Sequence, residues 1–323
     1  SDVAVMSYCR QIGLEVHLST QLNISNVEAL RFYAQFADVA VLARELNMDQ
    51  VRHIYEAIHG PEPILGPAGQ PVRIEMFCHG ALCMAVSGKC YLSLHESAHS
   101  ANRGSCRQIC RRAYTVRDRE SGEELVVDNK YIMSPKDLCT VDFLDRFLDA
   151  GVRVLKIEGR ARSADYVKRV VECYDEALRA IEEGTYTPER AEQWKERLRT
   201  VFNRGFWGGY YMGARAGEWS RTYGSSATVR KVYVGKVTNY FARIGVIELQ
   251  VEAAPLSVGE PVFLTGETTG VVEFVVEEIR VALKPVQEAP QGVLCSIKVP
   301  TLIRRGDKLF KTVPSDEKAD RNR

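Results

Sequence analysis

The residues of this chain with the clearest chemical potential are cysteines that gather in one stretch. Nine cysteines occur in 323 residues, and most of them fall between residues 75 and 139. The cysteines of this stretch are Cys78, Cys83, Cys90, Cys106, Cys110 and Cys139. Thiols concentrated in this way, in a chain long enough to build its own core, more often bind a metal than form disulfides. The stretch therefore predicts a metal site. The alternative is that these cysteines are small buried hydrophobic residues, which is our expectation for Cys78 and for the remaining Cys9, Cys173 and Cys295.

The spacing of the thiols indicates the kind of site. No Cys-x-x-Cys pair occurs, which argues against a zinc ribbon and a thioredoxin-type site. Widely spaced thiolates suit a four-thiolate iron–sulfur cluster, although spacing alone does not separate iron–sulfur from zinc. Cys139 is the best-placed candidate, because Ser134-Pro135-Lys136-Asp137 predicts a helix start whose dipole would lower the pKa of that thiol. Cys110 is an alternative to Cys106.

A competing motif lies in the same stretch. His95-Glu96-Ser97-Ala98-His99 matches His-Glu-x-x-His. On a helix the two histidines would share one face and bind zinc or another divalent metal, and Glu96 would activate water. The motif thus predicts a metal-dependent protease. A chance match is the alternative, since no long apolar helix and no obvious third ligand accompany it.

The pattern around these residues alternates between strands and helices. Strands are expected at residues 14–20, 39–45, 72–77, 130–133 and 152–159, and helices at 26–36, 48–58, 135–150, 165–181 and from 188 to near 205. Capping boxes at Ser25–Glu28 and Asn47–Gln50 and a Thr187-Pro188 start support three of these helices. The alternation predicts an α/β fold with a parallel sheet, as part of a TIM-like (βα) barrel that lacks three units at its front. The chain is then either truncated or an open sheet, and an exposed sheet edge would favour a partner or a homodimer.

Charged residues close several of the predicted strands, where the working residues of a parallel barrel lie. The catalytic candidates are Arg44, Glu45, Glu75, Glu158 and Arg160. The arginines could bind a carboxylate or phosphate through two hydrogen bonds, and the glutamates could transfer protons. Ion pairs that only close the barrel mouth are the alternative.

The composition changes after residue 205. We expect a partial barrel with the metal site over residues 1–205, a linker over 206–229, a small β-barrel over 230–313 and a disordered tail over 314–323. The formal net charge is +1, which does not indicate nucleic acid or membrane. Arginines crowd the cysteine stretch, either as a solvated face or as a phosphate-facing patch. Without a signal peptide or an apolar run of about 20 residues, we expect a cytoplasmic protein with no membrane partner.

Several segments together resemble the collagenase-like peptidase family of unknown catalytic type. They are EMFCHGALCMAVSGKCYLS, ANRGSCRQICRRAY, SPKDLC and KIEGRARSADYV. The resemblance covers nearly the whole chain and implies an incomplete TIM-like barrel followed by a β-barrel similar to the second domain of translation factors. This family includes proteins named collagenases and proteins that hydroxylate tRNA, ribosomal RNA or ubiquinone.

The resemblance also implies a function. In the hydroxylating members four cysteines hold a [4Fe–4S] cluster, and the matching positions are Cys83, Cys90, Cys106 and Cys139. The leading expectation is hydroxylation of a tRNA wobble uridine with prephenate as oxygen donor. One alternative is a metal-dependent endopeptidase that degrades type I collagen through His95, Glu96 and His99. Another is a non-catalytic RNA-binding factor with a structural cluster.

Overall fold

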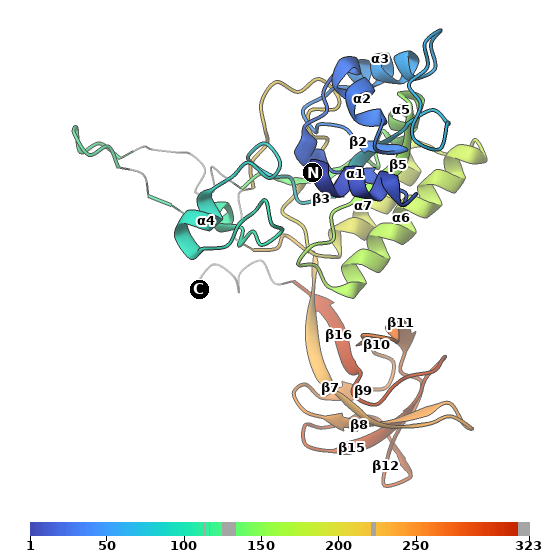
Figure 1. Cartoon of the computed structure of the whole chain (residues 1–323). Coiled ribbons are helices and arrows are strands. Elements are labelled where there is room, and N and C mark those ends of the chain that lie inside the picture. Colours follow the sequence, from blue (N-terminus) through green and yellow to red (C-terminus); the bar gives the residue numbers. More distant parts are fainter. Residues whose placement is uncertain (113, 116, 125–133, 221–223, 316–323) are drawn as a thin grey trace. The chain divides into compact units, whose positions relative to one another are not determined.

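The computed structural model describes residues 1–112, 114–115, 117–124, 134–220 and 224–315. The chain divides into two compact units (Figure 1). One unit comprises Ser1–Arg160 and Val170–Ser226, and the other comprises Ala161–Arg169 and Ala227–Arg323. The first unit combines helices with a mixed sheet, and the second is built mainly from antiparallel strands.

The strands of the first unit form one sheet. They are β1 (His17–Leu18), β2 (Val39–Val41), β3 (Arg73–Gly80), β4 (Asp137–Cys139), β5 (Val152–Ile157) and β6 (Phe206–Trp207). Their order is β1-β2-β3-β4-β6, and β5 also pairs with β3. The pairs β1–β2, β2–β3 and β3–β5 are parallel, which confirms the α/β class with a parallel sheet. β4 departs from this pattern, since it runs antiparallel to β3 at His79 and Gly80.

The helices begin where polar side chains cap them. The α-helices are α1 (Val3–Gln11), α2 (Val27–Ala34), α3 (Met48–Ile58), α4 (Leu92–Ser97), α5 (Leu144–Asp149), α6 (Ala164–Glu182) and α7 (Pro188–Arg199), with short 3-10 turns η1 (Thr20–Leu22) and η2 (Ile109–Arg111). The predicted capping box of Asn47 and Gln50 opens α3, and Thr187 caps α7. The box predicted at Ser25 is displaced by one residue. Asn26 is the N-cap of α2, and its side chain accepts a hydrogen bond from the Ala29 N–H at 2.8 Å.

The helix start predicted at residues 134–137 is wrong. Asp137 lies in β4, where its backbone N–H donates to the Gly205 carbonyl at 2.9 Å. Its buried carboxylate contacts the Arg204 guanidinium at 3.5 Å. These partners are distant in sequence, and they take the groups that would otherwise cap a helix. The next helix, α5, begins only at Leu144. The strand predicted at residues 130–133 lies outside the described residues.

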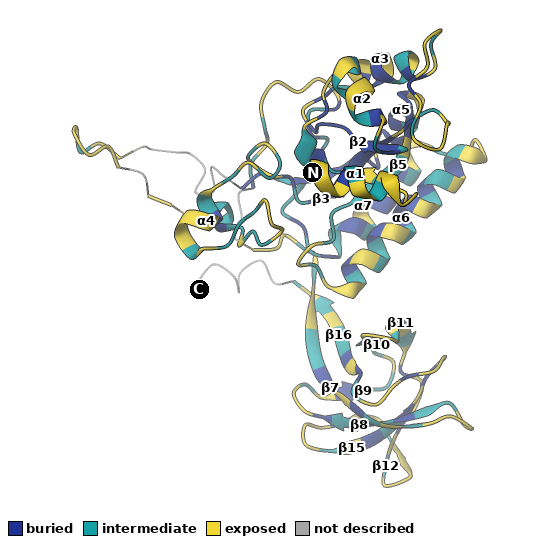
Figure 2. Ribbon diagram, in the orientation of Figure 1, coloured by how far each residue is buried: buried dark blue, intermediate teal, exposed yellow. Residues whose placement is uncertain are grey.

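The core of the first unit lies along the sheet (Figure 2). All three residues of β2 are fully buried, as is almost the whole of β3. Strands buried on both faces are typical of a parallel sheet covered by helices. α3 contributes Val51, Ile54 and Ile58 to this core.

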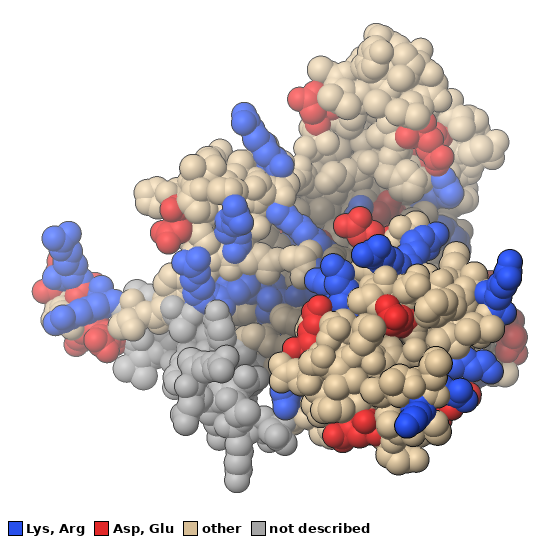
Figure 3. All heavy atoms as spheres, turned by 90° about the horizontal axis from the view of Figure 1, so that it is seen from below, with Lys and Arg blue, Asp and Glu red and all other residues tan. Residues whose placement is uncertain are grey.

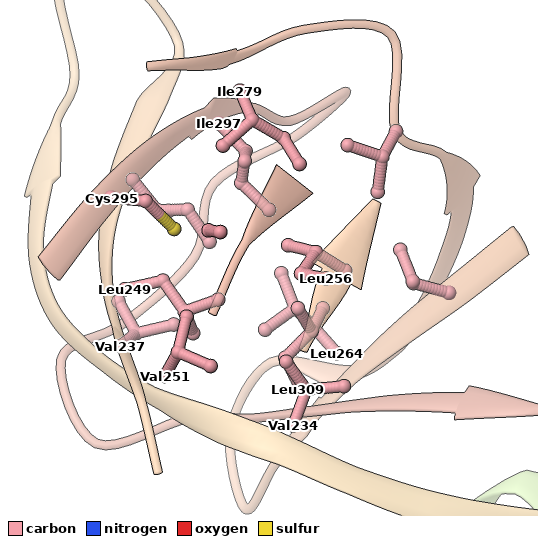
Figure 4. Close-up of a cluster of buried hydrophobic side chains, with 14 of the residues drawn as sticks. Val234, Val237, Leu249, Val251, Leu256, Leu264, Ile279, Cys295, Ile297 and Leu309 are labelled. Carbon is pink, nitrogen blue, oxygen red and sulfur yellow. The ribbon is translucent and has the colours of Figure 1, made fainter. Parts of the chain in front are cut away.

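The second unit has its own core (Figure 4). Its main sheet has the order β11-β10-β16-β7-β8-β15-β12-β13, and β9 pairs with β14. The strands are β7 (Val229–Phe241), β8 (Val246–Val251), β9 (Leu256–Ser257), β10 (Pro261–Gly266), β11 (Gly270–Val275), β12 (Ile279–Val281), β13 (Lys284–Val286), β14 (Glu288–Ala289), β15 (Leu294–Lys298) and β16 (Lys308–Pro314). In β8 every second residue is buried, so Ile247, Leu249 and Val251 face the interior as the two-residue period of a strand requires. Within the described ranges, no helix has the length and apolar character that crossing a bilayer requires.

Candidate functional site

The thiols that could hold a metal lie in the stretch between β3 and β4, which we call the cysteine segment (residues 81–112). It contains α4 and η2, and it turns at Gly88 and Gly104, whose φ angles are 74° and 76°. Glycine suits these turns because φ is positive there. At Gly88 a side chain would also meet Gln21, 2.9 Å from the position of a Cβ atom. Both glycines therefore shape the turns of this segment.

Four thiols of the cysteine segment share one electrostatic environment. Cys83 is exposed, and Cys90, Cys106 and Cys110 are partly buried. Burial raises the pKa of the Cys110 thiol, Arg111 lowers it, and Cys83, Cys106 and Cys90 raise it further. The Gln108 N–H donates to the Cys106 sulfur at 3.4 Å, the kind of contact that surrounds metal-bound thiolates. Among the described residues, no three cysteine, histidine or acidic side chains converge as metal ligands. The donor set thus fits four-thiolate chemistry by residue type, while its side chains, among the described residues, do not converge on one point.

Cys139 lies in a different environment from that predicted. It is at the end of β4, not in the first turns of a helix, and only 2% of it is exposed. Burial raises the pKa of its thiol to about 12. The Tyr174 hydroxyl lies 4.0 Å from its sulfur and donates to the Cys78 carbonyl at 2.8 Å. Cys78 is fully buried, as expected, and burial also raises the pKa of its thiol. Cys139 is thus buried in the sheet, whereas Cys110 lies beside the other thiols of the cysteine segment.

The His-Glu-x-x-His residues do not form the helical zinc site that the motif predicts. α4 ends at Ser97, and Ala98 has a left-handed conformation with a φ of 55°. The two histidines consequently do not lie one turn apart on one helix. The Nε2 atom of His99 contacts the Arg107 guanidinium at 2.6 Å, and Glu96 pairs with Arg112 at 3.6 Å.

Two arginines connect the cysteine segment to the rest of the first unit. The Arg160 guanidinium donates to the Gly104 carbonyl, and to the Cys106 carbonyl at 3.4 Å. The Arg111 guanidinium donates to the Leu82 and Pro135 carbonyls at 2.5 and 2.6 Å. Arg160 was expected to bind a substrate anion, but its described contacts go to backbone carbonyls. It therefore positions the turn that carries Cys106.

A second group of functional side chains lies along the parallel strands β1, β2, β3 and β5. We call it the strand-edge cluster, and it consists of His17, Arg44, Glu75, Phe77 and Lys156. The buried Glu75 carboxylate accepts hydrogen bonds from the Lys156 ammonium and the His17 imidazole, both at 2.8 Å. The parallel register between β3 and β5 places Phe77 opposite Lys156. A carboxylate between two basic groups, one of them half-exposed, can relay a proton from solvent into the unit.

Arg44 is the least satisfied member of this cluster. It is 8% exposed, and its guanidinium lies 5.6 Å from the centre of the Phe77 ring. No carboxylate among the described residues pairs with it. Its charge opposes the burial that raises the pKa of Tyr211, whose hydroxyl donates to the Phe77 carbonyl at 2.9 Å. A buried arginine without an acidic partner is suited to binding an anionic ligand.

The other predicted strand-end residues are placed less centrally. Glu45 is exposed, and Glu158 accepts a hydrogen bond from the Arg160 N–H at 2.8 Å. Lys156 and His17 were not among the predicted catalytic residues. The signal for Lys156 in the sequence was weak, since the segment VRVLKI also contains Arg153. Lys156 is partly exposed, and its partner is the buried Glu75.

Comparisons with known proteins support the family resemblance that the sequence segments indicated. A profile of peptidase family U32 matches residues 1–221. A Porphyromonas gingivalis protein named collagenase is 61% identical over 311 residues, which are 96% of this chain and 75% of that protein. The tRNA hydroxylation protein P1 of Bacillus subtilis is 32% identical over 77% of this chain and 58% of its own length. A 23S rRNA 5-hydroxycytidine synthase of Escherichia coli is 38% identical over 64% of this chain and 30% of its own length. These matches confirm the resemblance, and the chain belongs to peptidase family U32.

Proposed function

We propose that this protein is an iron–sulfur enzyme that hydroxylates a base of RNA, with a tRNA wobble uridine as the target and prephenate as the oxygen donor. The observation that carries the proposal is the shared environment of four thiols in the cysteine segment. The relatives named for tRNA and ribosomal RNA hydroxylation support the reaction class. The interrupted helix at Ala98 argues against the rival zinc site.

The residues that would hold a [4Fe–4S] cluster are Cys83, Cys90, Cys106 and Cys110. Such a cluster supplies redox chemistry that no side chain of the chain can provide. The contacts of Arg160 and Arg111 with the cysteine segment fix the backbone that presents these thiols. The Gln108 N–H would stabilise Cys106 in its thiolate form.

The strand-edge cluster would hold the co-substrate. Prephenate carries two carboxylates, and Arg44 is a buried cation with no acidic partner among the described residues. Glu75, bonded to His17 and Lys156, would move the proton that the reaction displaces. One oxygen atom leaves prephenate and enters a C–H bond of the base, so the co-substrate leaves with one oxygen atom fewer and the reaction needs no dioxygen.

Two finer features of the fold belong to the same proposal. The first unit would be an incomplete TIM-like barrel, whose open edge favours a homodimer. The small β unit and the arginines of the cysteine segment would hold RNA mainly through phosphate contacts.

The experiment that tests this function is a product assay on protein purified without oxygen. Iron and acid-labile sulfide are measured first, together with the visible spectrum. Unmodified tRNA is then incubated with the protein and prephenate, and its nucleosides are analysed by mass spectrometry. We expect a uridine that has gained one oxygen atom, and no gain with Cys110→Ser. Arg44→Lys should raise the prephenate concentration needed for half-maximal rate. A loaded cluster with no modified nucleoside would overturn the proposal.

A second candidate is a peptidase acting on collagen. It is favoured by one observation, the 61% identity to the Porphyromonas gingivalis protein named collagenase. Gelatin cleavage by the purified protein, abolished by Glu96→Gln, would support it despite the geometry of α4. Absence of gelatin cleavage in the presence of zinc and of other divalent metals would exclude the peptidase function.

A further inference from the structure

A pocket next to Cys90 has no role in the chemistry described so far. It lies between the turn at residues 88–91, the outer side of α4 and the loop at residues 98–105, and its volume is about 570 Å³. This size is typical of pockets that bind small organic molecules. The lining residues that matter here are Lys89, Cys90, Tyr91, His99 and Arg103.

The charge of this pocket is one-sided. Its lining includes Lys89 and Arg103 and no aspartate or glutamate. Both side chains are exposed, and neither has an ion-pair partner in the part of the chain that the structure describes. His99, which lines the pocket, accepts a hydrogen bond at Nε2 from the guanidinium of Arg107. On the face drawn in Figure 3, Lys and Arg side chains gather over the left-centre part of the surface. Such a wall attracts anions.

The pocket also presents an unused aromatic surface. Tyr91 is 74% exposed, more than any other exposed aromatic residue in the described part of the chain. It packs against no other ring in that part of the chain. An exposed tyrosine flanked by unpaired cations is the combination by which proteins bind single-stranded nucleic acid, since bases stack on the ring and phosphates meet the cations.

We infer that this pocket binds one nucleotide of a single-stranded RNA segment. The base stacks on Tyr91, and its flanking phosphates contact Lys89 and Arg103. The inference rests on the proposed function, because it places the RNA segment directly beside Cys90, one of the thiols assigned to the cluster. A collagen-like peptide suits the pocket less well, since it lacks the regular anionic groups that two unpaired cations would match.

Binding is measured directly, on the full chain purified without oxygen, by fluorescence anisotropy with a labelled single-stranded oligouridylate. Tyr91→Ala should weaken binding about 5- to 150-fold, the range for loss of one stacked base. Tyr91→Phe keeps the ring and should bind like the unaltered protein. Lys89→Ala and Arg103→Ala should each lower the slope of log affinity against log salt by about 0.7. Tyr8→Ala and Arg52→Ala are matched controls, since both residues are exposed, lie on other helices and should leave binding unchanged.

The outcomes separate this inference from its alternatives. No binding of the oligouridylate, or pocket variants that bind within twofold of the unaltered protein, would overturn it. Uridine monophosphate that competes as strongly as the oligonucleotide would also overturn it, because the ligand would then be a free nucleotide. Weak competition by the monophosphate supports the RNA segment. Binding that depends on Tyr91, with no hydroxylated product, would leave this pocket standing while the proposed reaction fails. If Tyr91→Ala forms the hydroxylated product as well as the unaltered protein does, the proposed reaction stands and the inferred RNA-binding pocket is wrong.

Discussion

The cysteines of the first unit occupy two opposite environments. Cys78 and Cys139 lie in the sheet, packed with Tyr174, and burial raises the pKa of both thiols. The cysteine segment holds its thiols outside the strands, partly open to solvent and beside arginines. The same residue type is therefore packed into the sheet in one place and accessible beside arginines in the other. Nearness in sequence does not determine which of these environments a cysteine occupies.

The sharpest way to break this comparison is to remove one thiol from each environment. Cys110→Ser should lose nearly all bound iron and sulfide, whereas Cys139→Ser should keep both. The reason is that Cys110 shares the environment of the other three thiols and Cys139 does not. Metal and sulfide per chain are measured after anaerobic purification, with circular dichroism as the control for folding. The opposite result would return Cys139 to the ligand set.

In metal-free protein, the thiols of the cysteine segment should react with an alkylating reagent much faster than the thiols buried in the sheet. A thiol pKa of about 12 instead of 9.0 lowers the thiolate fraction of Cys139 about 1000-fold near neutral pH, and burial slows it further. We expect iodoacetamide to label Cys83 first and Cys139 only on unfolding. Peptide mass spectrometry over time measures both. Equal labelling rates in folded protein would contradict the assignment of Cys139 to the core.

The same raised pKa predicts how stability depends on pH. The folded state holds the Cys139 proton more tightly than the unfolded chain does. The contribution of this proton to the free energy of unfolding is therefore fully present below about pH 9. It is lost as the pH rises towards 12. Denaturant titrations of the unaltered protein and of Cys139→Ala should differ in this window, and the unaltered protein should lose more stability.

The ion pair between Arg204 and Asp137 tests whether β4 contributes to stability independently of the cysteine segment. Arg204→Met should lower the free energy of unfolding by about 3–5 kcal/mol, because it leaves the Asp137 carboxylate buried without this cation. Adding Asp137→Asn should recover part of the loss. Denaturant melts measure the change, and iron content serves as the control. A strong loss of iron in folded Arg204→Met would mean that β4 and the metal site are coupled.

The smallest expected effect concerns Tyr174. Tyr174→Phe removes the acceptor of the Thr140 N–H and should cost about 1–3 kcal/mol of unfolding free energy. Iron content should stay unchanged. Phe147→Leu, elsewhere in the same core, is a size-changing control that leaves the hydroxyl network intact. An unchanged denaturation midpoint for Tyr174→Phe would mean that solvent replaces the lost acceptor.

Much of the fold could be predicted from local signals. The Asn47–Gln50 box and the Thr187-Pro188 start depend on groups within one helical turn, so the sequence carries all the information needed. The 134–137 prediction failed because the same residue types found distant partners. Asp137 is held by Arg204 and by the backbone of Gly205, which no local pattern reveals.

The candidate site could be predicted only where local sequence carried the information. The concentration of cysteines identified the segment. Which thiols share a neighbourhood depends on how β3 and β4 pair, and that pairing puts Cys139 opposite His79 in the sheet. The His-Glu-x-x-His motif predicted a helix that continues through Ala98, whereas the backbone there is left-handed.

The position of the cysteine segment between two strands has a consequence for the assembly of the sheet. The ladders that join β3 to β2, β5 and β4 involve residues 39–41, 73–80, 138–139 and 152–157, and no residue of 81–112 pairs in them. The strand ladders of the first unit therefore form without any pairing from the cysteine segment. If the proposed cluster binds there, its insertion would be a step separate from the pairing of these strands.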